Sequence, residues 1–72
     1  MRLLGLDPGL RHTGWGIINT KDDIISWIAS GNVSPKNSLC ISERLKIIHN
    51  ELNEIIHEFN PSVAAVEEVF VN

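Results

Sequence analysis

Residues 3–19 read LLGLDPGLRHTGWGIIN, and the rest of the fold is built around this stretch. Its short apolar run ends at Asp7, and a Pro-Gly pair follows directly, so the pattern predicts a buried strand over residues 2–7. After a polar loop, residues 13–19 predict a second strand, and a turn separates it from a third strand over residues 24–33. Two short turns between three strands indicate an antiparallel meander.

The hydrophobic period changes after the meander. Seven apolar side chains fall within an arc of about 100° on a helical wheel, which is typical of an amphipathic helix packed on a sheet. They are Ile41, Leu45, Ile48, Leu52, Ile55, Ile56 and Phe59. Asn60-Pro61 is expected to end this helix. Residues 62–70 then predict a fourth strand, which the helical crossover makes parallel to the first. The expected fold class is therefore α/β.

Composition describes an ordinary piece of a globular protein. Hydrophobic residues make up 43% of the 72 residues and charged residues 21%, which excludes a disordered tail, a collagen-like segment and a disulfide scaffold. The net charge of −3 gives no support for a basic nucleic-acid-binding surface. No apolar run is long enough for a transmembrane segment, so we expect no membrane association. The single cysteine, Cys40, favours a reducing, cytoplasmic setting.

Carboxylates follow two strands that are expected to run parallel in the sheet. Asp7 ends the first strand, and Glu67 and Glu68 end the fourth, so all three are expected at the edge where sites form in α/β sheets. Alternation sends the two glutamates to opposite faces, and periodicity does not decide which one joins Asp7. The plainer reading is that Asp7 begins a turn and that the glutamates are solvated at a strand end.

A shared site for two carboxylates would need a cation, because like charges at close range repel each other. Oxygen ligands of this kind suit Mg²⁺ or Mn²⁺. A pair of such ions can activate water and stabilise the leaving oxygen in phosphodiester hydrolysis.

Three aromatic side chains could either pack in the core or stack on a nucleic-acid base. Trp15 and Trp27 are expected to pack in the core. Phe70 follows the acidic pair at the open end of the strand and could stack on a base, although core packing is the commoner role at such a position.

Four segments of the chain match a known family in order and spacing. They are residues 4–16, 29–31, 43–45 and 65–70, and together they resemble RuvC-type Holliday-junction resolvases. The resemblance implies an RNase H-like fold, with residues 1–72 as the N-terminal part of a single nuclease domain. It also implies a homodimeric endonuclease that uses Mg²⁺, with Mn²⁺ as a substitute, to cut four-way DNA junctions in recombination and repair. A branch-migration helicase complex is the further partner it implies.

The same resemblance implies roles for individual residues. Asp7 matches the family's first catalytic aspartate and Glu67 its catalytic glutamate, both metal ligands, whereas Glu68 falls where the family carries a non-catalytic residue. Phe70 matches an aromatic position near the DNA. The family completes its site with two aspartates on a C-terminal helix, and most of its basic DNA-contacting residues also lie beyond the position of Asn72. We therefore expect a fold that is incomplete at its C-terminus and a chain that is inactive alone.

Other functions compete with this hypothesis. Sugar-kinase and actin-like ATPases also open with a Gly-x-Asp-x-Gly hairpin that cradles phosphates, but residues 11–16 fit them poorly; ATP binding would discriminate. An RNase H-like nuclease acting on RNA is a related alternative. The non-enzymatic alternative is an inactive truncated remnant that acts only through association.

Overall fold

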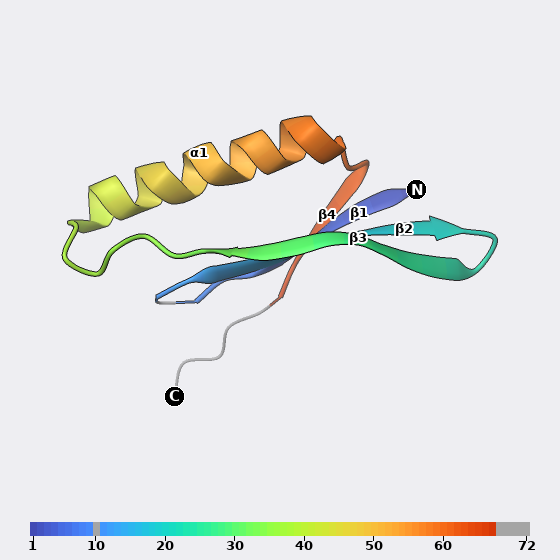
Figure 1. Ribbon diagram of the computed structural model, residues 1–72, viewed down its shortest axis with the longest axis horizontal. Coiled ribbons are helices and arrows are strands. Elements are labelled where there is room, and N and C mark those ends of the chain that lie inside the picture. The colour runs from blue at the N-terminus through green and yellow to red at the C-terminus, as the bar shows by residue number, and fades with distance from the viewer. Residues whose placement is uncertain (10, 68–72) are drawn as a thin grey trace.

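The computed structural model describes residues 1–9 and 11–67. The described residues form one helix and one four-stranded sheet. Figure 1 shows the helix lying over one face of the twisted sheet. The elements in chain order are β1 (Arg2–Asp7), β2 (Thr13–Lys21), β3 (Ile24–Val33), α1 (Ile41–Phe59) and β4 (Val63–Val66). The first and third strands have the bounds predicted from the sequence, and the second is two residues longer. The fourth is described from residue 63 to residue 66, and Glu68 and Phe70 lie outside the described residues.

The strand order in the sheet is β3-β2-β1-β4. β2 pairs antiparallel with both β1 and β3, which confirms the predicted meander. β4 pairs with β1 in parallel, and α1 forms the crossover between the meander and β4, as Figure 1 shows. The predicted meander and the predicted directions of all four strands are confirmed.

The β2–β3 hairpin turns on two residues and contains one irregularity. Asp22 and Asp23 have φ values of 52° and 64°, the left-handed backbone that a two-residue turn of type I′ requires. Further along, the register shifts between Ile17 and Ile18, which pair with Ala29 and Trp27 respectively. The shift marks a β-bulge, where one strand gains an extra residue and the pairing beyond it moves by one.

The core lies between the sheet and the last turns of α1. Leu4, Ile17 and Ile55 are buried together, one each from β1, β2 and α1. The partly buried side chains packed around them are Leu6, Trp15, Ile28, Leu52 and Phe59. The rings of Trp15 and Phe59 lie 6.1 Å apart between centroids, within the range of a favourable aromatic pair.

The predicted apolar stripe of α1 is only partly covered. Its C-terminal half packs on the core through Leu52, Ile55 and Phe59, because the buried side chains of β1 and β2 lie beneath that end. The exposed members of the stripe are Ile41 (72%), Leu45 (60%) and Ile56 (43%). Within the part of the chain that the structure describes, no helix is long and apolar enough to cross a membrane.

The prediction for Trp27 is wrong. Its side chain is exposed, at 70%. Trp27 pairs with Ile18, whereas the buried Ile17 pairs with Ala29, so the bulge leaves Trp27 on the face that α1 does not cover.

α1 begins after Cys40 and ends at Asn60. The backbone of Cys40 is extended, and its carbonyl oxygen accepts a hydrogen bond of 3.0 Å from the backbone N–H of Arg44. Asn60 adopts the left-handed conformation that commonly closes helices, and its N–H donates to the carbonyl oxygen of Ile56 at 2.8 Å. The predicted end of the helix is confirmed.

Hydrogen-bonding groups near Cys40 lower the pKa of its thiol. The Ser42 hydroxyl lies 3.2 Å from Cys40 Sγ, and this contact, followed by the backbone N–H of Glu43, lowers the pKa of the Cys40 thiol. We expect the rate of Cys40 alkylation by iodoacetamide to rise at lower pH in the folded protein than in denaturant. Because the folded pKa is the lower one, the thiolate stabilises the fold above the unfolded pKa and loses this effect as pH falls through the folded value.

The matched variants are Ser42→Ala and Ser38→Ala. Removing the Ser42 hydroxyl should move the alkylation midpoint of Cys40 upward, because the thiolate loses its hydrogen-bond donor. Ser38 is also exposed and close in sequence, and its replacement should leave the midpoint unchanged. Equal midpoints in the folded and unfolded protein would contradict the expectation.

Candidate metal centre

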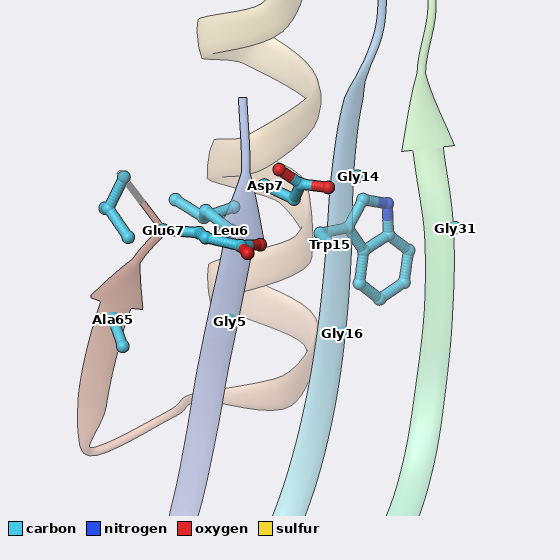
Figure 2. A pocket seen from close by; sticks show the side chains of 10 residues that line it. Gly5, Leu6, Asp7, Gly14, Trp15, Gly16, Gly31, Ala65 and Glu67 are labelled. Carbon is cyan, nitrogen blue, oxygen red and sulfur yellow. The ribbon is translucent and has the colours of Figure 1, made fainter. Parts of the chain in front are cut away.

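Asp7 and Glu67 lie at the ends of two neighbouring strands, at one edge of the sheet. Leu6 pairs with Val66 in the parallel ladder, and the backbone N–H of Glu67 donates a hydrogen bond of 2.9 Å to the carbonyl oxygen of Leu6. Asp7 follows Leu6 on β1, and Glu67 follows Val66 on the neighbouring chain segment, so the two residues lie at the same level of the sheet. Figure 2 shows both side chains at this edge, with the Glu67 carboxylate extended toward β1.

The pairing places Glu67, by alternation, on the same face as Asp7. Paired residues of parallel strands point to the same side of the sheet, so Asp7 and Glu67 share the face opposite Leu6 and Val66. Periodicity alone left the choice between Glu67 and Glu68 open, and the resemblance favoured Glu67. The described geometry brings Glu67 to Asp7, and Glu68 lies outside the described residues.

The two carboxylates lie on the open face of the sheet. Leu4 and Ile17 point to the opposite face, where they are buried against α1. Asp7 and Glu67 are both exposed. A large substrate can reach them from this side, because α1 covers only the other face.

Several glycines line a pocket beside the two carboxylates. The pocket has a volume of about 470 Å³, and Figure 2 shows the side chains that line it. Its carboxylates and glycines are Asp7, Glu67, Gly5, Gly14, Gly16 and Gly31. A Cβ on Gly16 would meet no atom within 4 Å, so the backbone there faces open space. Such a surface lets a bulky group approach the backbone closely.

The turn after Asp7 also depends on a glycine. A Cβ on Gly9 would lie 2.7 Å from the carbonyl oxygen of His12, closer than real Cβ contacts. Asp-Pro-Gly follows β1 where the chain reverses toward the antiparallel β2, and this reversal coexists with the placement of Asp7 at the same edge as Glu67.

The pair of carboxylates fits a hard divalent cation. Both side chains offer only oxygen, and Mg²⁺ is usually held by one or two carboxylates while it keeps several waters. Across residues 1–9 and 11–67, no group of three or more His, Cys, Asp or Glu side chains is close enough to hold a metal. Among the described residues, Asp7 and Glu67 are the two carboxylates that the β1–β4 pairing places at this edge of the sheet (Figure 2).

Asn32 is a polar neighbour of the site that sequence reasoning missed. Gly14 pairs with Asp7 on one side and with Asn32 on the other, so the three residues form one row across β1, β2 and β3. Counting back from the two-residue turn would pair Gly14 with Gly31. The bulge shifts the register by one and brings Asn32 into the row. No sequence signal marks this bulge.

Comparison with known proteins agrees with this architecture. A family model described as crossover junction endodeoxyribonuclease RuvC matches residues 3–72. The crossover junction endodeoxyribonuclease RuvC of Paramagnetospirillum magneticum is 50% identical over 72 residues, which are 100% of this chain and 43% of that protein. The chain thus spans less than half the length of the curated relatives it matches.

Solved structures show the same fold. Thermus thermophilus RuvC in complex with a Holliday junction substrate superposes with a TM-score of 0.89 at 29% identity, over 100% of this chain and 46% of that one. The Aquifex aeolicus Ppx/GppA phosphatase shares the fold alone, with a TM-score of 0.69 at 20% identity over 92% of this chain and 25% of that one. The expected RNase H-like fold is confirmed, and the chain belongs to the RuvC family of crossover junction endodeoxyribonucleases.

Proposed function

We propose that the whole protein encoded by this gene is an endonuclease that resolves four-way DNA junctions by metal-dependent hydrolysis of phosphodiester bonds. The observation that carries the proposal is the placement of Asp7 and Glu67 together on the open, glycine-lined face of the sheet. Family membership supports it, and so does the Holliday junction substrate bound by the T. thermophilus relative.

Asp7 and Glu67 would hold Mg²⁺, with Mn²⁺ as a substitute. A divalent cation at such a site lowers the pKa of bound water and offsets charge that develops on the phosphate oxygens. The chain's own part is to hold two negative side chains in step, which the β1–β4 ladder does through backbone pairing. Gly16 leaves room for a phosphate group beside them.

These residues form part of the proposed site. The family resemblance assigns two further carboxylates and most basic DNA contacts to positions beyond this chain. The chain's net charge of −3 is consistent with that division, since DNA affinity comes mainly from Lys and Arg. We propose that residues 1–72 alone do not cleave DNA, and that Phe70 contacts DNA near the junction.

The proposed partners follow from the substrate. A four-way junction is resolved by two symmetrical cuts, and a homodimer supplies two active sites related by a two-fold axis. We propose a homodimer that works in the cytoplasm with a branch-migration helicase complex.

The test is cleavage of defined substrates by the whole protein in Mg²⁺. The substrates are a four-way DNA junction, a linear DNA duplex of the same sequence and an RNA–DNA hybrid. We expect paired cuts in the junction alone, and their loss when EDTA removes the metal. Cleavage of the hybrid in place of the junction would favour the RNA nuclease, and no cleavage of any substrate would favour the inactive remnant.

A further inference from the structure

We propose that Asn32 is a positioning residue for Asp7, whose carboxylate it holds by a hydrogen bond, direct or through one water, across the gap left by Gly14. The inference rests on the proposed function, because it assigns Asn32 a role in the affinity of the Asp7 site for a divalent cation. Neither the family resemblance nor the sequence pattern singles out Asn32.

The register and two distances bring Asn32 and Asp7 together. Both pair with Gly14, one from β3 and one from β1, and all three point to the open face. The position that a Cβ on residue 14 would occupy lies 3.4 Å from Asn32 Oδ1 and 3.7 Å from Asp7 Cβ. The two side chains thus flank the same empty position. In Figure 2 the Asp7 carboxylate leans toward Gly14.

The chemistry of the two groups is complementary. A carboxylate only accepts hydrogen bonds, and an Asn amide donates two through its nitrogen. The oxygen and nitrogen of an amide exchange places by a flip that retains the side chain's shape, so the N–H can face Asp7. If one Asp7 oxygen accepts from Asn32, the other remains for a cation on the Glu67 side. Because the amide is neutral, it orients the Asp7 carboxylate and leaves the negative charge that attracts the cation in place.

Groups that orient a ligating carboxylate affect the affinity of the site for its metal. Loss of such an outer partner typically weakens metal affinity or activity about 10- to 100-fold. The proposed contact also requires a glycine at position 14. A methyl group there would stand between the side chains of Asn32 and Asp7, at ordinary contact distances from both. Gly14→Ala should therefore separate Asn32 from Asp7 with the strand pairing intact.

The experiment measures Mn²⁺ binding by the whole protein, from the electron paramagnetic resonance signal of the free ion. Asn32→Leu, which keeps the approximate shape and removes the amide, should weaken binding about 10- to 100-fold. Gly14→Ala should weaken it too, and the double variant should be no weaker than the weaker single variant, because both changes remove one interaction. Cleavage by Asn32→Leu should recover as Mg²⁺ is raised.

Ser30→Ala is the matched control. Ser30 lies on β3, is exposed and pairs with Gly16 on the same face, one row away from Asp7. Its replacement should leave Mn²⁺ affinity unchanged, and all variants should keep the thermal unfolding midpoint of the parent protein.

Three outcomes overturn the inference. If Asp7→Asn abolishes Mn²⁺ binding while Asn32→Leu and Gly14→Ala retain full affinity, Asn32 has no positioning role and the proposed function stands. If Asn32→Leu weakens binding only as much as Ser30→Ala does, the role is equally contradicted. If Mn²⁺ binding does not depend on Asp7, the proposed function fails and the role of Asn32 fails with it.

Discussion

Replacing Asp7 with Asn in the whole protein should lower the rate of junction cleavage by at least about 10³. The substitution keeps the size of the side chain and removes the negative charge that would hold the cation. A loss of this size corresponds to about 4 kcal/mol in the activation free energy. Affinity for the junction should change little, because binding depends mainly on phosphate contacts by basic residues. Single-turnover cleavage and fluorescence anisotropy measure the two quantities separately.

A second variant at the site and two control variants test whether the effect is specific to these carboxylates. Glu67→Gln should reduce cleavage by a similar factor, because Glu67 lies in step with Asp7 on the neighbouring strand. Asp23→Asn and Glu58→Gln make the same chemical changes at the β2–β3 turn and on the exposed side of α1, and they should cleave at the parent rate. An Asp7→Asn protein that cuts junctions normally, or one that loses binding and still cuts, would refute the role of Asp7.

Ile17→Ala should lower the free energy of unfolding by about 3 kcal/mol. Ile17 is 0% exposed and packs with Leu4 and Ile55 at the centre of the core. Truncation removes the transfer free energy of the lost methyl and methylene groups and leaves a cavity, and such changes in a core typically cost about 2–5 kcal/mol. Urea denaturation of the whole protein measures the effect.

The same substitution at Ile25 is the control. Ile25 lies in β3 of the same hairpin and is 70% exposed, so Ile25→Ala should change stability by no more than about 0.5 kcal/mol. Equal losses for the two variants would contradict the placement of Ile17 at the centre of the core.

Local patterns predicted most of the fold because each pattern carries its own physical signal. The apolar run that stops at Asp7, the turn at residues 22–23 and the 3.6-residue period of α1 are all short-range features, and they determined the elements and their order. The parallel pairing of β1 and β4 followed from the crossover. The bounds of β1 and β3 are as predicted for the same reason.

Features that depend on long-range contacts could not be predicted from the sequence. The bulge at Ile17/Ile18 has no local signal, yet it places Trp27 on the open face and brings Asn32 into the row of Asp7. The exposed members of the α1 stripe, including Leu45, follow the same periodicity as the buried members. Alternation alone could not choose Glu67, because that choice needs the register of β4 against β1.

The central claim is that Asp7 and Glu67 form one divalent-cation site, and cleavage of the protein by bound iron tests it most directly. Fe²⁺ that replaces Mg²⁺ generates hydroxyl radicals in the presence of ascorbate and peroxide, and these cut the polypeptide close to the metal. In the whole protein we expect fragments that end near residue 7 and near residue 67, suppressed by excess Mg²⁺ and absent from the Asp7→Asn variant. Cuts confined to other parts of the chain, or cuts that persist in Asp7→Asn, would contradict the claim.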